Sequence, residues 1–140
     1  MASELKDTID ILSKLGFVTG SITPPDEEHF GNWVLLTTRP PVALRVTNDR
    51  GVILLDLSEF DTFEAGAKES DWFNWDVVAR ALGIQEVTAE SQLVSLAENF
   101  GKVESAFLRW NWEATRDLLH NIEADKRRQF MEGHRMPAHA

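Results

Sequence analysis

The sequence contains no cysteine, so disulfide bonds, thiolate zinc sites and cysteine catalysis are all excluded. It also contains no tyrosine, although five tryptophans and eight phenylalanines are present. Its apolar runs reach only four residues, as in Val52 to Leu55, far short of the ~20 residues of a membrane-spanning helix. The first residues are polar and lack the basic and apolar regions of a signal peptide. We therefore expect a cytoplasmic protein without a membrane partner.

Positive charge is also scarce, because 14 Lys and Arg residues face 23 Asp and Glu residues, which gives a net charge of −9. The acids are densest between Asp56 and Asp76, where Lys68 is the only base. Such a field repels phosphate backbones and favours a basic protein partner, so we expect no binding to nucleic acid. The carboxylates expected to face this partner are those of Asp56, Glu59, Asp61, Glu64, Glu69 and Asp71.

The N-terminal part of the chain predicts one helix followed by a loop. Gly16 follows the helix and can take the left-handed conformation that ends it, whereas Gly and Pro residues interrupt residues 18–30. A helix over residues 4–15 is expected because four apolar residues share one helical face: Leu5, Ile9, Leu12 and Leu15.

The middle of the chain predicts β-structure. Alternating apolar and polar residues indicate a three-stranded antiparallel β-meander over about 32–57, with Gly51 in a bulged hairpin turn. Beyond it three helices are expected, because apolar residues return to helical spacing at about 71–82 and again from 89 to 131. The expected fold is therefore α+β, with an N-terminal helix, the meander, and three C-terminal helices packed on the sheet.

The C-terminal helices carry a heptad-like seam of apolar residues. The segment from Asn99 to Gly101 looks like a helix stop within it, so the region is either one long helix or two helices, about 89–100 and 103–131. Residues 1–132 are expected to form a single domain and residues 133–140 a flexible C-terminal tail. The seam could also join two copies of the chain, and its residues are Leu93, Leu96, Phe100, Val103, Phe107, Trp110 and Ala114.

The sequence carries no recognisable catalytic or metal-binding motif. It lacks G-x-S-x-G, H-E-x-x-H and a complete phosphate loop, so we expect no metal and no cofactor. His120 lies one helical turn from Asp117 and from Glu123, an arrangement that could orient a general base. If the chain is an enzyme with a dispersed site, the first residues to test are Asp26, Glu28, His29 and His120.

The tryptophans are the least ordinary feature, because tryptophan is enriched among the residues that carry binding energy at protein interfaces. Trp72 and Trp75 would share one face of the predicted helix inside the acidic stretch and form an aromatic anchor ringed by carboxylates. If Trp110 lies in the buried seam, Trp112 must point elsewhere, which makes Trp112 a second interface candidate.

Three classes of function are compatible with these features. Charge and aromatic content favour a small acidic protein-binding module: an inhibitor, or immunity (antitoxin-like) protein, that neutralises a basic toxin or effector. In size, acidity and α+β class the chain is similar to small bacterial immunity proteins, a likeness of architecture that covers no specific motif. The alternatives are a secretion chaperone or adaptor that acts as a homodimer through the seam, and an enzyme with a dispersed site.

Overall fold

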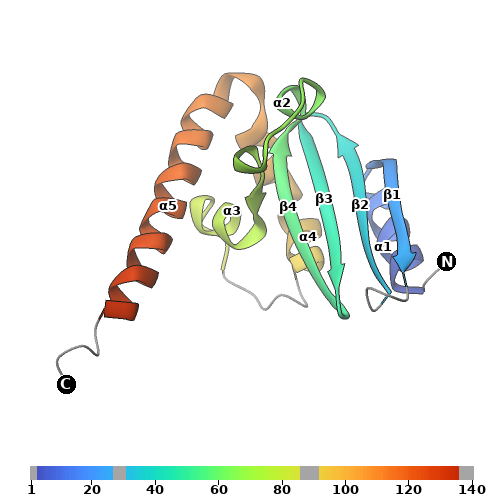
Figure 1. Ribbon diagram of the computed structural model, residues 1–140. Helices are drawn as coiled ribbons and strands as arrows, with labels where there is room; N and C mark the ends of the chain where they lie inside the picture. Colours follow the sequence, from blue (N-terminus) through green and yellow to red (C-terminus); the bar gives the residue numbers. More distant parts are fainter. Residues whose placement is uncertain (1–2, 27–30, 86–91, 136–140) are drawn as a thin grey trace.

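The computed structural model describes residues 3–26, 31–85 and 92–135 (Figure 1). Its helices and strands follow one another in the chain order α1 (Ser3–Lys14), β1 (Val18–Asp26), β2 (Asn32–Arg39), β3 (Val42–Asp49), β4 (Val52–Glu59), α2 (Phe60–Glu64), the 3-10 helix η2 (Glu69–Asp71), β5 (Phe73–Asn74), α3 (Trp75–Ala81), α4 (Gln92–Phe107) and α5 (Arg109–Arg135).

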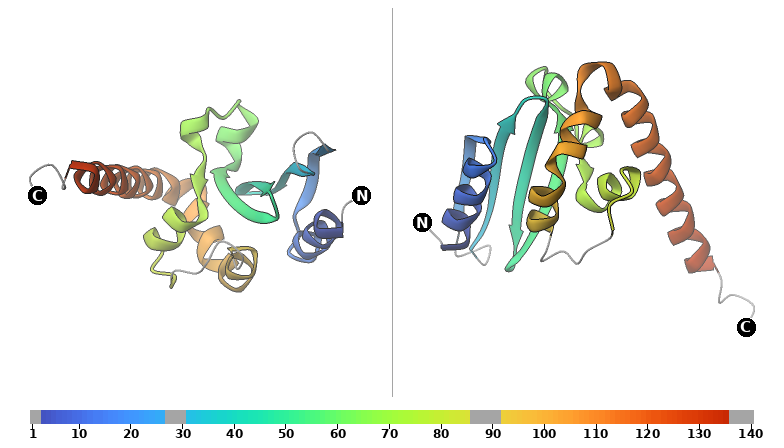
Figure 2. Two further views of the ribbon diagram at one scale, coloured as in Figure 1. Left: turned by 60° about the horizontal axis from the view of Figure 1, so that its bottom comes forward. Right: turned by 180° about the vertical axis from the view of Figure 1, so that it is seen from behind.

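One antiparallel sheet, with strand order β1-β2-β3-β4-β5, forms the centre of the molecule. Helices α1 and α4 cover one face of this sheet, whereas α2 lies toward the opposite face, close to β4 (Figures 1 and 2). The expected α+β fold, with its N-terminal helix, antiparallel meander and helices packed on the sheet, is therefore confirmed. The sheet has five strands rather than three, because β1 and β5 are added at its two edges.

The end of α1 follows the prediction made from Gly16. This glycine has a φ of +91°, its N–H donates to Ser13 O at 3.0 Å, and the N–H of Phe17 donates to Leu12 O at 3.0 Å. The two bonds form a Schellman motif, which favours glycine because other residues are strained at positive φ. Arg39 Nη1 donates to the carbonyl of Leu15 at 2.8 Å and so ties the end of α1 to the sheet.

The prediction of a loop over residues 18–30 is wrong for Val18–Asp26, which form β1. This strand lies at the edge of the sheet, so Pro24 and Pro25 can belong to it without interrupting a ladder on the outer side. The register with β2 shifts at Gly20, where the strand carries an irregularity. An edge strand with prolines and a bulge has too little alternation to be recognised by its period.

The turn between β3 and β4 is tighter than the bulged hairpin expected at Gly51. Asp49 and Val52 pair directly in the ladder, which leaves Arg50 and Gly51 as a two-residue turn. Both turn residues have positive φ, 53° and 87° respectively. That combination is the type I′ geometry, whose twist matches that of the two strands it joins.

The helix predicted over residues 71–82 begins later, at Trp75. The preceding residues Phe73 and Asn74 instead pair with β4 as the short strand β5. Asn74 then caps α3, because its side-chain oxygen accepts a hydrogen bond from the N–H of Asp76 at 3.1 Å. The pairing of Phe73 and Asn74 with β4 and the capping by Asn74 therefore set the start of the helix. Helical periodicity alone does not reveal either interaction.

The region forms two helices, α4 and α5, as one of the two expectations had it, but the chain breaks at Leu108 rather than near Gly101. Asn99 only kinks α4, with φ −118° and ψ 15°. Its side-chain Nδ2 donates to the carbonyl of Ser95 at 2.9 Å and so supports the kink. The apparent helix stop in the sequence is thus a local distortion inside one helix.

Side chains from α5 stabilise the break at Leu108. Asn111 Nδ2 donates to the carbonyl of Ser105 at 2.8 Å, and Thr115 Oγ1 donates to the carbonyl of Ala106 at 2.8 Å. These carbonyls belong to the last turn of α4, where intrahelical partners are missing. With both satisfied, the chain reverses and α5 runs back alongside α4 and α3 (Figure 2).

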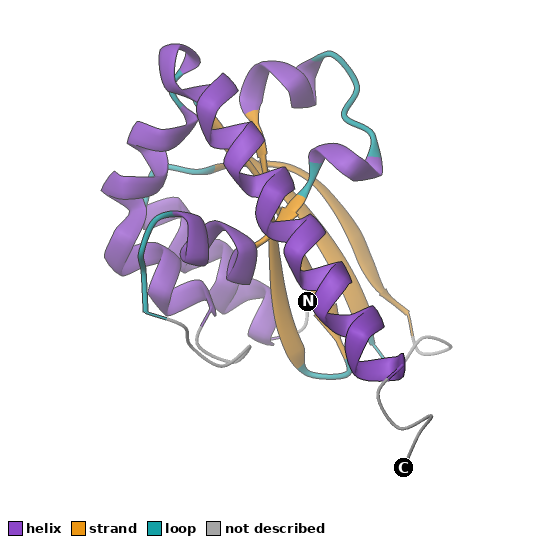
Figure 3. Cartoon of the chain, turned by 90° about the vertical axis from the view of Figure 1, so that its left-hand side faces the viewer, coloured by secondary structure: helices purple, strands orange, loops and turns teal. Residues whose placement is uncertain are grey.

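Helix α5 crosses in front of the sheet in the view of Figure 3, and its C-terminal end projects away from the other elements (Figure 2, left). Residues 133–135, expected to begin the flexible tail, belong to this helix, and residues 136–140 lie outside the described part of the chain. Helix α5 has 27 residues, which is long enough to span a membrane, but many of its side chains are charged. Within the described ranges, every helix is too short or too polar to cross a membrane.

The hydrophobic core fills the space between the covered face of the sheet and the helices, and it uses most of the seam. The five seam residues from Leu93 to Phe107 are buried, but Trp110 and Ala114 follow the break and are exposed. The largest side chains of this core are those of Trp33, Trp75, Phe73 and Phe107.

We expect Phe107→Ala to lower the free energy of unfolding by about 3–5 kcal/mol, because it removes a fully buried ring and leaves a cavity. Trp110→Ala should change it by no more than about 0.5 kcal/mol, since that side chain is exposed. Urea unfolding followed by circular dichroism measures both values. A large loss in Trp110→Ala would contradict the break at Leu108 and return Trp110 to a continuous buried seam.

Candidate functional site

Arg45 is the centre of the polar surface formed by the acidic stretch. It lies on β3 directly opposite Asp56 on β4, and its Nη2 is 3.2 Å from Asp56 Oδ2. The same guanidinium donates to both oxygens of Glu69, at 2.8 Å and 3.0 Å. Its central carbon lies 4.8 Å from the ring centroid of Trp72, in a cation–π contact. One cation therefore gathers two of the candidate carboxylates and one candidate tryptophan.

The pKa values of Glu69 and Arg45 are shifted by their ion pair. The pKa of Glu69 lies below the ordinary value of a glutamate, first because Arg45 donates to the carboxylate and second because its charge attracts it. The pKa of Arg45 is raised, first by the hydrogen bond to Glu69 and then, against the opposing effect of burial, by the charge of Asp56. Glu69 remains exposed to water, so its pairing fastens a surface segment rather than a buried one.

The ring of Trp72 is half-buried and already has two partners. Besides Arg45, the edge-to-face contact with Phe63 occupies it, at a centroid distance of 5.8 Å and an angle of 73°. Trp72 thus holds the segment after α2 against the sheet. It can offer only its remaining edge to a partner unless this cluster rearranges.

Two further carboxylates of the predicted surface are committed to local structure. Glu59 is only 6% exposed, and its Oε1 accepts hydrogen bonds from the N–H of Thr62 at 2.9 Å and from its hydroxyl at 2.8 Å. It is therefore the N-cap of α2. Asp71 Oδ2 accepts from the N–H of Lys68 at 2.8 Å and closes the turn at η2.

The carboxylates of Asp61 and Glu64 are the uncommitted ones. Both are exposed on α2, on the side of the sheet opposite α1 and α4 (Figure 2). In the part of the chain that the structure describes, neither forms a hydrogen bond or ion pair through its side chain. Of the predicted partner-facing acids, these two are the ones fully available to an incoming cation.

Two of the three tryptophans proposed as interface residues belong to the core instead. Trp75 is 1% exposed, so its ring is not part of the surface, and it does not share a helical face with Trp72, which precedes β5. Trp112 packs its ring on Phe107 at 4.9 Å and on Phe73 at 6.2 Å. The break at Leu108 turns Trp112 inward, the reverse of what the continuous seam predicted.

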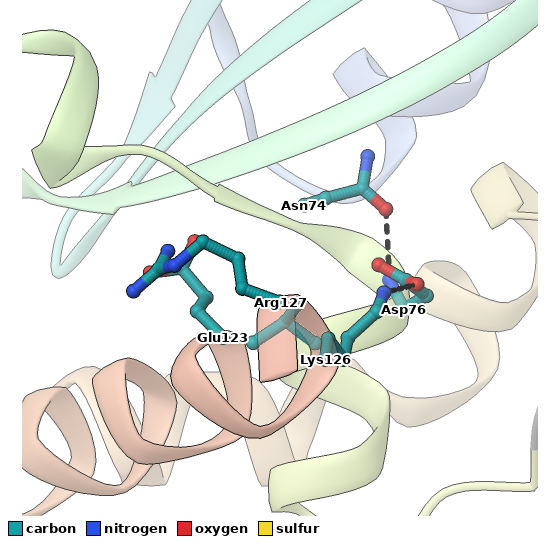
Figure 4. Close-up of a pocket in the computed structure, with 6 residues that line it drawn as sticks. Asn74, Asp76, Glu123, Lys126 and Arg127 are labelled. Carbon is teal, nitrogen blue, oxygen red and sulfur yellow. Dashed lines mark hydrogen bonds and ion pairs between the residues drawn. The ribbon is translucent and has the colours of Figure 1, made fainter. Parts of the chain in front are cut away.

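A cleft of about 390 Å³ lies where the start of α3 faces the middle of α5 (Figure 4). It is lined by charged side chains from both helices, and Lys126 forms an ion pair with Asp76 across it. Glu123 and Arg127 supply one further charge of each sign. Because acids and bases balance here and the cleft is open, its geometry favours a link between two helices rather than a ligand site.

Of the four candidate catalytic residues, His120 is the one whose surroundings the structure describes. His120 is half-exposed on α5, 3.5 Å from Glu123 Oε1 as the spacing predicted, and its ring lies 5.0 Å from that of Phe73. Asp117 is paired with Arg116 instead. Glu28 and His29 lie outside the described residues. Across residues 3–26, 31–85 and 92–135, no three His, Asp or Glu side chains lie close enough together to hold a metal ion.

The aromatic residue that the sequence did not single out is Trp110, which is 78% exposed. It is the second residue of α5, just after the break, and it lines a mainly apolar cavity of about 310 Å³. The seam spacing assigned it to the core. The side chains of Asn111 and Thr115 contradict that assignment, because they donate hydrogen bonds to the end of α4. These bonds are visible in the structure but cannot be inferred from the residue types alone.

No family model matches the chain, and no curated protein or solved structure matches it either. A function for this chain therefore has to follow from its geometry. That geometry gathers Asp56, Glu69 and Trp72 around Arg45, and it leaves Asp61 and Glu64 exposed on α2.

Arg45→Gln should raise the pKa of Glu69 toward the ordinary value of a glutamate. Since the folded-state pKa is the lower one, the pairing stabilises the fold above the unfolded-state pKa, and this contribution is lost as pH falls through the folded-state value. Carbon NMR of the side-chain carboxyl during an acid titration gives the midpoint. Arg116→Gln, which removes a cation from α5, is the control and should leave it unmoved. An unchanged midpoint in Arg45→Gln would show that the pair does not form.

Proposed function

We propose that this chain is a protein-binding module that neutralises a basic protein, as an inhibitor of the immunity or antitoxin kind. The observation that carries the proposal is the exposed pair of carboxylates, Asp61 and Glu64, on a short helix that stands apart from the helical layer. Carboxylates without internal partners remain free to pair with lysine or arginine side chains of another protein.

Electrostatics supports a basic partner over other classes of ligand. The net charge of −9 attracts a basic protein at long range and raises the rate of encounter. Nucleic acid would be repelled by the same field. Action in the cytoplasm, where a toxin or effector would otherwise reach its target, suits a chain of this kind.

The seam gives less support to a homodimeric chaperone or adaptor than the sequence suggested. Leu96, Val103 and Phe107 are each 0% exposed within a single chain, so these side chains are not available to a second copy. His120 pairs with Glu123 and is half-exposed at the surface, which gives an enzyme little support. An inhibitor that acts by occupying its partner requires neither feature.

The proposal predicts binding that depends on both salt and the α2 carboxylates. In a pull-down from native lysate, a basic protein should be captured at about 50 mM salt and released at about 500 mM, because the Debye length shortens to a few ångströms. The double variant Asp61→Asn/Glu64→Gln should capture much less of the same protein, identified by mass spectrometry. A second measurement, the association rate by surface plasmon resonance, should fall in the variant more than the dissociation rate rises.

The matched control is Asp7→Asn/Asp10→Asn, which removes the same charge from exposed positions on α1. It should bind nearly as well as the wild type, because α1 lies on the other side of the sheet (Figure 2). If both double variants lose binding equally, net charge alone accounts for the capture. Capture that is insensitive to salt and to α2 would overturn the proposal.

A further inference from the structure

Trp110 is the most exposed large apolar side chain among the described residues, at 78%. It lies in the first turn of α5, where the hydrogen bonds of Asn111 and Thr115 hold the backbone firmly to the end of α4. A tryptophan fixed in this way exposes a large ring without the entropic cost of ordering a flexible loop. Tryptophan is also the side chain most enriched among interface hot spots.

Beside Trp110 is a cavity of about 310 Å³ whose walls are mainly apolar. Pro40 and Pro41 from the β2–β3 turn, Phe60 from α2, and Leu108 from the break form these walls. Three segments far apart in the sequence, residues 40–41, 59–61 and 108–110, thus meet at one end of the molecule, the upper end in Figure 1. The volume is at the small end of the ~300–1,000 Å³ range of ligand pockets, which suits one or two side chains rather than a large cofactor.

The rim of this cavity is charged, and its sign indicates what kind of partner fits. Asp61 lines the cavity with its exposed carboxylate, and Glu64 lies one turn further along α2. Arg109, at the start of α5, contributes one positive charge, so the rim is acidic at α2 and basic at α5. Cations of a partner would therefore approach from α2, next to the apolar walls.

We infer that this cavity receives an apolar side chain of the basic partner, with Trp110 as the anchor and with adjacent lysine or arginine side chains on Asp61 and Glu64. The inference rests on the proposed function and assigns its short-range contact. A second copy of this chain is a poor occupant, because each copy carries a net charge of −9 and presents the same acidic α2. A basic segment with one large apolar residue complements both the walls and the rim.

Two synthetic peptides of equal charge test the inference directly. The first carries a Leu-Phe pair between two pairs of lysines, and in the second the Leu-Phe pair is replaced by Gly-Ser. Binding is followed at about 50 mM salt by fluorine NMR of protein labelled with 5-fluorotryptophan, and Trp110→Phe identifies the Trp110 signal. We expect the Leu-Phe peptide to move that signal and to bind about fivefold or more tightly than the Gly-Ser peptide, as for a hot-spot contact.

In Trp110→Ala the preference for the Leu-Phe peptide should disappear, while circular dichroism shows an intact fold. Val94→Ala is the matched control, because it also truncates an exposed apolar side chain, 55% exposed, but near the opposite end of α4. It should keep the preference. In Asp61→Asn/Glu64→Gln both peptides should bind more weakly, and the ratio of their affinities should change little.

Three outcomes would overturn the inference: equal affinity of the two peptides for the wild type, no binding of the Leu-Phe peptide, or a preference that persists in Trp110→Ala. The proposed function is judged separately, because lysate capture that still depends on salt and on Asp61 and Glu64 would stand in each case. Sedimentation of the wild type and of Trp110→Ala tests whether a second copy of the chain occupies the cavity. A wild-type dimer that Trp110→Ala dissociates would assign the cavity to a second copy and overturn the inference as well.

Discussion

The need to cover one face of the sheet, and the length of that face, determine how the rest of the chain is arranged. A strand of eight residues such as β4 spans about 26 Å, and a helix of 16 residues such as α4 spans about 24 Å. Helix α4 therefore runs out of sheet to cover at Phe107, its last buried seam residue. The chain breaks at Leu108 and returns as α5, which packs Leu119 and Trp112 against the core but leaves Trp110 exposed. Trp110 lies outside the core because α4 is about as long as the strand that it covers, and Trp110 comes after its end.

The opposite side of the sheet is organised by charge. Asp56 is held in place by its strand, so Arg45 pairs with it across the ladder and still has donors for Glu69, which draws the segment after α2 toward the sheet. Counting Arg45 and Lys126 with the stretch from Asp56 to Asp76 lowers its net charge from −6 to −4. Part of the acidity thus serves the fold. The proposed binding therefore depends on the exposed carboxylates of α2 rather than on the whole stretch.

Elements that depend on local chemistry could be predicted from the sequence, and elements that depend on distant neighbours could not. Helix α1 and its Gly16 cap follow from apolar spacing and one glycine, and the meander follows from alternation. The edge strand β1 lacks that alternation, since pairing with β2 rather than burial on both faces makes it a strand. The heptad spacing could not distinguish a continuous seam from one that ends at Leu108, because 3-4 spacing fits both.

The candidate site shows the same division. The exposure of Asp61 and Glu64 was predictable, because unpaired acidic side chains are almost never buried. The helix α2 that carries them was not predicted. The roles of the tryptophans were not, because each depends on what packs against it: Trp75 begins a helix under β4, and Trp112 meets Phe73 and Phe107.

Electrostatic attraction acts over a longer distance than apolar contact. This chain places exposed acidic and apolar side chains around the same cavity. The field of Asp61 and Glu64 acts over about a Debye length, some 8 Å at physiological salt, whereas an apolar side chain contributes only on contact. A partner oriented by the first would arrive already close to Trp110, because α2 and the break at Leu108 line the same cavity. Each element is fixed by its own bonds, Glu59 at the start of α2 and Asn111 at the start of α5, so little order has to be gained on binding. An exposed tryptophan on a rigid turn beside free carboxylates is therefore the arrangement that the proposed partner, with its apolar and basic groups, would complement.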